Sequence, residues 1–217
     1  MALFRDRQDA GARLAEKLEG YAGSSAVVLG LPRGGVPVAA DVAARLGLPL
    51  DVFIVRKLGV PGYPELAMGA IATGGVRVMN HAIVRELGIR EEAIDAVAKS
   101  EAAELERREA AYRGSGAPLD VQDKTVILVD DGLATGATML AAVRALRARR
   151  AGRIVVAVPV GPPETCAMLS EEADEVVCAA APQPFLAVGN WYEDFAPTSD
   201  EEVRALLSSP PSRRHVA

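Results

Sequence analysis

Residues 125–139 read TVILVDDGLATGATM, and this stretch decides the fold that the sequence predicts. Its first part, 125–131, is an apolar run that ends in two acids, Asp130 and Asp131. Such a run, bounded by turn residues, is typical of a buried strand. From residue 137 to residue 152 the apolar residues recur at helical spacing. The stretch therefore predicts a strand, a short loop and a helix, in that order.

Apolar runs and helical patterns alternate along the rest of the chain. We expect further strands at 26–31, 51–57, 153–160 and 174–179. We expect helices at 6–19, 36–47, 163–172 and 200–207, the last opened by a capping box of Ser199 and Glu202. Because the strands are almost continuously apolar, this order predicts an α/β fold with a parallel sheet flanked by helices.

Two segments between the strand expected at 51–57 and the strand expected at 125–131 have patterns of their own. Residues 70–80 predict a small hairpin that turns at Gly74 and Gly75. Residues 81–113 predict one long helix whose dense, mixed charges place most of its surface in solvent. The length of 217 residues suits one domain with a modest added lobe, or one large domain, and we expect a single domain over 1–217.

Composition and charge exclude several functional classes. The net charge of -5 argues against general nucleic-acid binding. No apolar stretch suits a signal peptide or approaches the roughly 20 residues that span a bilayer. Cys166 and Cys178 have no Cys-x-x-Cys or histidine partners, so we expect buried thiols in a reduced, cytoplasmic protein and no metal site.

The loop from Asp130 to Thr138 carries the chemistry. It follows a strand of a parallel sheet, and ligands bind at this edge of such sheets. The first N–H groups of the next helix form an anion site, and Gly136 allows the backbone to approach a phosphate closely. The hydroxyls of Thr135 and Thr138 add donors, while the two carboxylates suit hydroxyl groups or a metal. A phosphate beside a diol describes a ribose 5-phosphate.

Other interpretations of this loop fit less well. It lacks the Gly-Lys-Ser/Thr of a Walker A motif and is not a Gly-x-Gly-x-x-Gly dinucleotide loop. A hairpin turn at Asp131-Gly132 with solvated acids is the structural alternative. A hairpin needs a second strand, however, and the residues that follow have a helical pattern.

Residues 126–138 resemble the phosphoribosyl-pyrophosphate (PRPP) signature of the type I phosphoribosyltransferases: four apolar residues, two acids, then Thr-Gly-x-Thr. Gly132 departs from it, since the family more often has an aliphatic residue there. The resemblance covers about residues 24–180 and implies that family's parallel sheet, with a small hood and a flexible loop. It implies that Asp130 and Asp131 hold the ribose hydroxyls. The residues implied to wrap the 5-phosphate are Ala134, Thr135, Gly136, Ala137 and Thr138.

The same resemblance implies a pyrophosphate site in a second loop, LPRGG at 31–35, through Arg33, Gly34 and Gly35. A simple tight turn is the alternative. Arg56 and Lys57 end the predicted strand 51–57, and we expect them to neutralise the departing pyrophosphate, although ordinary surface charges would look the same. The following loop, 58–68, resembles the family's flexible lid, in which Glu65 is the one titratable residue.

The expected reaction transfers a 5-phosphoribosyl group from PRPP to a nitrogen heterocycle, with a purine base as the leading choice and Mg²⁺ as cofactor. We expect residues 182–195 and part of 81–113 to form the hood. Residues 81–113 alternatively form a dimer surface. The aromatic candidates in the hood for stacking on the acceptor are Phe185, Trp191 and Tyr192. Alternatively, these aromatic residues close the hydrophobic core. Two other functions stay open: a PRPP-sensing regulator without turnover and a carrier of a ribose phosphate. A homodimer is expected by analogy with similar proteins.

Overall fold

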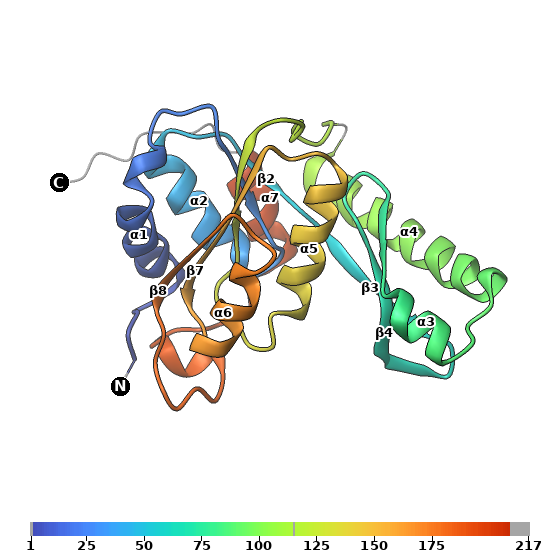
Figure 1. Ribbon diagram of the computed structural model, residues 1–217. Coiled ribbons are helices and arrows are strands. Elements are labelled where there is room, and N and C mark those ends of the chain that lie inside the picture. Colours follow the sequence, from blue (N-terminus) through green and yellow to red (C-terminus); the bar gives the residue numbers. More distant parts are fainter. Residues whose placement is uncertain (1, 115, 209–217) are drawn as a thin grey trace.

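A parallel sheet of five strands forms the centre of the computed structural model, which describes residues 2–114 and 116–208 (Figure 1). The strands lie in the order β2-β1-β6-β7-β8, and each neighbouring pair is parallel. Their bounds are Val27–Gly30 (β1), Leu50–Val52 (β2), Thr125–Val129 (β6), Arg153–Val160 (β7) and Glu175–Ala180 (β8). The expected α/β fold with a parallel sheet is confirmed.

Helices cover both faces of this sheet, which explains its almost continuously apolar strands. Helices α1 (Arg7–Lys17) and α2 (Gly35–Leu46) cover one face, where Val28 and Ile127 are buried. Helices α5 (Ala137–Ala148) and α6 (Pro163–Ser170) cover the other face (Figure 1). Because side chains alternate along a strand, neighbouring residues enter two different cores.

Helix ends follow the signals in the sequence. The carboxylate of Asp6 accepts a hydrogen bond from the Asp9 amide at the start of α1, and Gly47 ends α2 in the left-handed conformation. At the last helix, α7 (Asp200–Ser208), the Ser199 hydroxyl accepts from the Glu202 amide at 3.1 Å. The helices expected from these patterns are confirmed, with ends that differ by a few residues.

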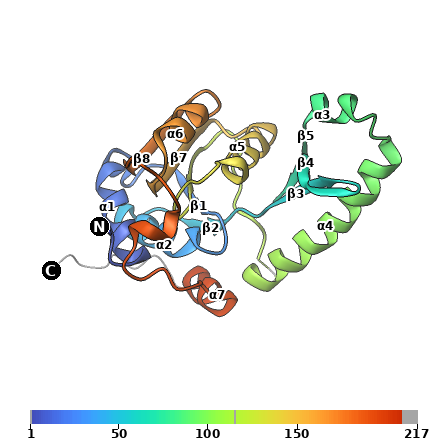
Figure 2. The ribbon, with the colours of Figure 1, turned by 90° about the horizontal axis from the view of Figure 1, so that it is seen from below.

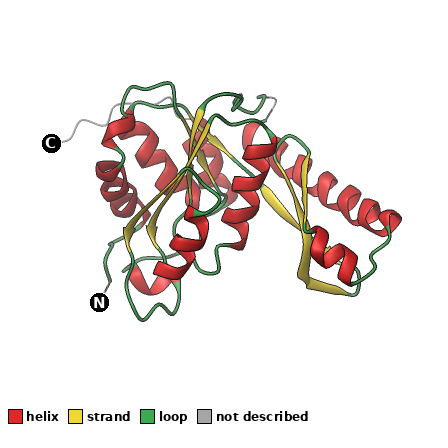
Figure 3. Cartoon of the chain, in the orientation of Figure 1, coloured by secondary structure: helices red, strands yellow, loops and turns green. Residues whose placement is uncertain are grey.

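A second sheet of three antiparallel strands lies beside the first, and Figure 3 shows it as a separate group of strands. Its strands are Val55–Val60 (β3), Tyr63–Ala72 (β4) and Val76–Met79 (β5). The turn between β4 and β5 contains Gly74 and Gly75, both with positive φ, so the predicted hairpin is confirmed.

Two expectations about this region are wrong. The single strand 51–57 is divided, because β2 ends at Val52 and the chain then crosses to β3. At the crossing the amide of Ile54 donates to the Thr73 hydroxyl at 2.9 Å. The loop expected at 58–68 is mostly strand, since β3 and β4 form a hairpin around Pro61 and Gly62.

The helix expected over 81–113 is interrupted into α3 (His81–Glu86) and α4 (Glu91–Arg113). Gly88, with φ of +58°, lies in the break, a conformation that favours glycine. Helix α4 buries Ala98, Leu105 and Tyr112 in a core shared with β3, β4 and α7. Figure 2 shows α4 running beside these strands, with α7 near one end of it. None of the helices in the described ranges is long and apolar enough to cross a membrane.

Candidate active site

The two predicted ligand loops leave the central sheet side by side. Gly30 at the end of β1 pairs with Val129 at the end of β6. The next residue, Leu31, donates its amide to the Val129 carbonyl at 2.9 Å. A Cβ atom on Gly35 would lie 2.7 Å from that carbonyl oxygen, so only glycine allows this approach. The loop 31–35, which contains a cis Pro32-Arg33 peptide, is therefore packed against the start of the loop 130–138.

Asp130 and Asp131 lie at the carboxyl end of β6, and both are half-buried. The Asp131 amide donates to the Asp130 carboxylate at 2.9 Å. Burial raises the pKa of Asp130 well above its ordinary value, and the neighbouring charge of Asp131 raises it further. Burial also raises the pKa of Asp131, although Arg7 opposes this increase. The two acids therefore have different environments, and only Asp131 has a guanidinium partner in the described structure.

Arg7 of α1 is a site residue that the sequence analysis missed. Its Nε and Nη2 atoms each lie 2.9 Å from Asp131 Oδ2. Its Nη1 donates to the Ala196 carbonyl at 2.7 Å, and its guanidinium lies 4.0 Å from the centre of the Phe195 ring. A Cβ atom on Gly34 would lie 2.0 Å from Asp131 Oδ2, so the same carboxylate also contacts the loop 31–35. Arg7 thus connects α1, both loops and the C-terminal segment.

The loop 134–138 leads into α5 and has the features of an anion site. Gly136 is the N-cap of α5 and has a φ of +74°. Ala134, Thr135, Ala137 and Thr138 are exposed at the positive end of the helix, where the Ala137 amide donates to the Thr135 hydroxyl at 3.4 Å. Thr165 of α6, also missed from sequence, donates its hydroxyl to the Ala134 carbonyl at 2.9 Å and supports the loop from behind.

Gly132, the departure from the family pattern, has a structural reason. A Cβ atom there would lie 2.5 Å from Val188 Cγ1 and 3.1 Å from the Val160 carbonyl oxygen. Val188 begins a short 3₁₀ helix, Val188–Trp191, in the segment expected to form the hood. The Val188 side chain therefore fills the space that an aliphatic residue at position 132 would need.

The aromatic residues of 182–195 pack over the same edge of the sheet. Tyr192 is buried, with its ring centre 5.4 Å from that of Phe4 and 4.9 Å from that of Phe195. Its hydroxyl donates to the Asp131 carbonyl at 2.6 Å, which ties the segment to the loop. Phe185 and Trp191 are partly exposed, with ring centres 6.1 Å apart. Tyr192 is therefore placed to support the loop, whereas Phe185 and Trp191 have the more accessible rings.

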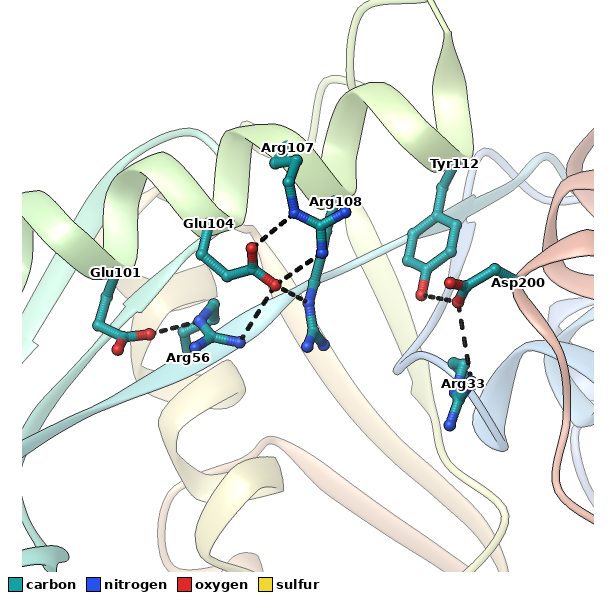
Figure 4. A network of polar contacts seen from close by, with 8 residues as sticks. All are labelled: Arg33, Arg56, Glu101, Glu104, Arg107, Arg108, Tyr112 and Asp200. Carbon is teal, nitrogen blue, oxygen red and sulfur yellow. Dashed lines mark hydrogen bonds and ion pairs between the residues drawn. The ribbon is translucent and has the colours of Figure 1, made fainter.

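The expected position of Arg56 and Lys57 is wrong, because they lie within β3 of the second sheet and do not end a parallel strand. Arg56 Nε lies 2.5 Å from Glu101 Oε2, and its Nη1 lies 3.9 Å from Glu104 Oε1 on α4 (Figure 4). Lys57 is exposed. Arg33 is where the sequence analysis expects it, in the loop 31–35, with its Nη1 4.0 Å from Asp200 Oδ1.

The other titratable residues that the sequence analysis considered do not lie together in the structure. Glu65 is exposed on β4, in the hairpin that occupies the expected lid. Cys166 and Cys178 are free thiols and only partly buried, and burial raises the pKa of Cys178 to about 12. Among residues 2–114 and 116–208, no group of three or more His, Cys, Asp or Glu side chains is arranged to hold a metal ion.

Comparison with known proteins identifies the family of this site. A family model described as the phosphoribosyl transferase domain matches residues 5–185. The Mycobacterium tuberculosis H37Rv protein described as "Putative phosphoribosyl transferase Rv0571c" is 50% identical over 207 residues, which are 95% of this chain and 47% of that protein. The protein described under the name MT0597 in strain CDC 1551 matches equally well. The chain therefore spans about half the length of the curated relatives it matches.

A solved structure matches along almost its whole length. The crystal structure of TT1426 from Thermus thermophilus is 45% identical, has a TM-score of 0.86, and covers 95% of this chain and 98% of its own. The agreement extends over both sheets, since so little of either chain is left out. Together with the match over residues 5–185, it shows that the chain belongs to the phosphoribosyl transferase domain family and has the type I phosphoribosyltransferase fold.

Proposed function

We propose that this chain transfers a 5-phosphoribosyl group from PRPP to a nitrogen heterocycle, with release of pyrophosphate. The observation that carries the proposal is the contact between the loops 31–35 and 130–138 at the carboxyl edge of the central sheet. One loop offers carboxylates and helix N–H groups, and the other offers Arg33 and backbone N–H groups. This arrangement matches the ribose, the 5-phosphate and the pyrophosphate of one PRPP molecule.

The donor sugar is assigned to the loop 130–138. The 5-phosphate would bind the N–H groups of 134–138 at the start of α5 and the hydroxyls of Thr135 and Thr138. The ribose hydroxyls would donate to Asp130 and Asp131. Asp131 is held in place by Arg7 at 2.9 Å, so its position is set before the sugar arrives. Rigid placement of the sugar lowers the barrier to attack at its anomeric carbon.

The leaving group is assigned to the loop 31–35. Arg33 is partly exposed, and its distance of 4.0 Å from Asp200 leaves the guanidinium loosely held. Gly34 places a backbone N–H group near the carboxyl end of β1, whereas the Gly35 amide donates to the Leu31 carbonyl at 3.0 Å. A cation and oriented N–H groups stabilise the negative charge that develops on pyrophosphate. Lys57 is exposed and remains a candidate second cation, whereas Arg56 is already paired with Glu101 and Glu104.

The donor set fits magnesium held through PRPP and water. Asp130 has no ion-pair partner among the described residues, and burial raises its pKa although the charge of Arg7 opposes the increase, so a bound cation nearby would stabilise its charged form. When bound, Mg²⁺ neutralises charge on pyrophosphate oxygens while keeping several waters. The residues of this chain would orient the ribose hydroxyls and pyrophosphate that surround the ion.

The acceptor is assigned to the space beneath the segment 182–195. Phe185 and Trp191 are partly exposed aromatic residues of a kind that suits stacking on a flat heterocycle, and a purine base is our leading choice. Tyr192 is assigned the role of supporting the Asp131 backbone. Helix α4 would complete the hood. A homodimer and a cytoplasmic location stay predictions.

One observation favours a second candidate, a PRPP-sensing regulator without turnover. Arg56, expected to stabilise the leaving group, is engaged by two carboxylates of α4. A sensor has no need for a second cation on pyrophosphate. Both candidates share the PRPP site, and they differ in whether a base is consumed.

Turnover distinguishes the two. The protein would be incubated with PRPP, Mg²⁺ and a pool of nucleobases and related heterocycles, and new nucleotide masses and pyrophosphate release would be followed. The control is the double variant Asp130→Asn, Asp131→Asn. A base-dependent product that is absent in the variant supports the enzyme and names the acceptor. PRPP binding without any product supports the sensor, and absence of PRPP binding contradicts both.

A further inference from the structure

A pocket of about 220 Å³ lies between the loop 31–35, α4 and α7, and it shares only Arg33 with the PRPP site described above. It is lined by Arg33, Arg107, Arg108, Ala111, Tyr112 and Asp200, most of which are labelled in Figure 4. Three of these residues are arginines, in a chain whose net charge is -5. Such a local excess of positive charge is not explained by the overall composition.

The two arginines of α4 share one carboxylate. Glu104 accepts from Arg107 Nε at 2.7 Å and Nη2 at 2.9 Å, and from Arg108 Nε at 2.8 Å. It also lies 3.9 Å from Arg56 Nη1. Glu104 is therefore in contact with three guanidinium groups. Hydrogen bonds from Arg107 and Arg108 lower its pKa to about 2, so it stays ionised. Glu101 pairs with Arg56 as well, so two carboxylates face three guanidinium groups, and one positive charge remains on this face of α4.

The guanidinium groups also keep free donors. Among residues 2–114 and 116–208, Arg108 Nη1 and Nη2 and Arg107 Nη1 have no protein acceptor in hydrogen-bond contact. The side chains of Arg107 and Arg108 are 67% and 41% exposed, so these donors are accessible. A guanidinium presents paired donors that match the oxygens of phosphate and carboxylate groups.

Asp200 at the start of α7 is the one acidic residue in the pocket lining. Its Oδ1 accepts from the Tyr112 hydroxyl at 2.8 Å and lies 4.0 Å from Arg33 Nη1. Burial and Asp200 raise the pKa of Tyr112 to about 12, so the phenol is neutral and donates. Asp200 thus lies where an anionic ligand would lie, and it would oppose such a ligand by charge repulsion.

We propose that this pocket is a second anion site, which binds a phosphate-type oxyanion through Arg33, Arg107 and Arg108. The oxyanion has two chemical sources: pyrophosphate itself, or a phosphate carried by the acceptor or by an effector. Arg33 belongs to both the loop 31–35 and the pocket lining, so the anion site adjoins the pyrophosphate loop. The site depends on Arg33 and on two arginines of α4 and not on transfer, so it stands even if the proposed function is wrong.

Calorimetric titration with sodium pyrophosphate at constant ionic strength tests this site. The variant Arg107→Gln, Arg108→Gln is compared with Arg85→Gln, Arg204→Gln, which removes two exposed arginines outside the pocket lining. The pocket variant should bind pyrophosphate at least about tenfold more weakly, because two charge-assisted contacts are lost. The control variant should bind as the unaltered protein does. Thermal unfolding of each variant checks that the fold is retained.

A substitution that removes negative charge from the pocket should change the affinity in the opposite direction. Asp200→Asn should bind pyrophosphate more tightly, because it removes repulsion and frees Arg33, whereas Glu201→Gln on the same helix should not change the affinity. Equal affinities for the pocket and control arginine variants, or weaker binding by Asp200→Asn, would overturn the proposal.

A second titration at saturating PRPP identifies the source of the anion. If pyrophosphate still binds and still requires Arg107 and Arg108, the pocket takes an anion separate from the donor. If PRPP prevents that binding, the pocket takes pyrophosphate of the donor. Both results support an anion site. Absence of PRPP binding by the unaltered protein, with pyrophosphate binding that still requires Arg107 and Arg108, would support this site and contradict the proposed function.

Discussion

Asp131 is the residue on which the site converges, because its carboxylate contacts Arg7 and its carbonyl accepts from Tyr192. Replacing Arg7 by Gln leaves this carboxylate without its cation. We expect the free energy of unfolding to fall by about 3 kcal/mol, as when one partner of a largely buried ion pair is removed. The control Arg13→Gln removes a half-exposed guanidinium from Asp9, which keeps Arg5 as a partner, and should cost less than about 1 kcal/mol. Urea unfolding compares the two, and equal losses would contradict the assigned role of Arg7.

Asp130 should make stability depend on pH. Its pKa in the folded protein is raised above the ordinary value of 3.8 by burial and by Asp131. Between these two pKa values the folded state keeps a proton that the unfolded state has lost, so the free energy of unfolding falls as pH rises. Above the folded pKa this penalty is complete. Asp130→Asn removes it and should raise the midpoint of thermal unfolding at neutral pH by a few degrees.

The measurement is urea unfolding of both proteins from about pH 4 to about pH 8. The advantage of Asp130→Asn should grow as pH rises and be smallest near the acidic end. Parallel pH profiles would show that the Asp130 carboxyl titrates alike in the folded and unfolded states.

At the scale of elements, the turn into α5 depends on Gly136. A Cβ atom there would lie 2.7 Å from Thr165 Cγ2, and the φ of +74° disfavours any other residue. Gly136→Ala should therefore weaken PRPP binding by about tenfold or more, which corresponds to about 1.4 kcal/mol. Gly23→Ala is the matched control, because Gly23 has a φ of +66° and open space around its Cα. It should cost about 1–2 kcal/mol of stability and leave PRPP affinity unchanged. Equal PRPP affinities in both variants would contradict the loop assignment.

Elements with a strong local period are predictable from the sequence. The strands β1, β6, β7 and β8 are apolar runs between turn residues, and α2 and α5 have regular apolar faces, so local patterns locate them. The run 51–57 looks equally continuous, yet it is divided between two sheets. Its division depends on the long-range contact of Ile54 with Thr73, which no local pattern reveals.

Other differences between the predicted and the observed structure had a weak signal in the local sequence, or none. Gly88 followed by Glu91 and Glu92 is a usable signal for the break between α3 and α4, because glycine ends helices and acids begin them. The partnership of Arg7 and Asp131 joins residues 124 positions apart, so it is invisible in a single sequence. The chemistry of 130–138 is predictable because strand, acids, glycine and helix start are contiguous.

At the scale of the whole molecule, the N-terminal residues 3–5 pair with residues 191–194, which lie far along the chain, beside the candidate site. The amides of Leu3 and Phe4 each donate to the Trp191 carbonyl at 2.9 Å, and the Asp194 amide donates to the Arg5 carbonyl at 2.8 Å. This strap of residues 3–5 and 191–194 lies against the loop 130–138 through Tyr192. The N-terminal and C-terminal segments therefore support the site together, although neither carries the signature.

Tyr192→Phe tests this strap. The loss of the hydroxyl that donates to Asp131 should cost about 1 kcal/mol of stability and weaken PRPP binding. Tyr21→Phe is the control, because its hydroxyl donates to Glu175 at 2.6 Å and supports the opposite end of β8. It should cost similar stability without changing PRPP affinity. Equal PRPP affinities in the two variants would show that the strap does not position the loop.

PRPP binding is the most direct test of the central claim, that the loop 130–138 holds the ribose phosphate. Calorimetry with PRPP and Mg²⁺ would compare the unaltered protein with Asp130→Asn, Asp131→Asn and with Asp120→Asn, Asp123→Asn. The second pair removes two exposed acids before the opposite end of β6. We predict binding by the unaltered protein and the control, and an affinity at least about tenfold lower without Asp130 and Asp131. Unchanged PRPP affinity in that variant would contradict the account.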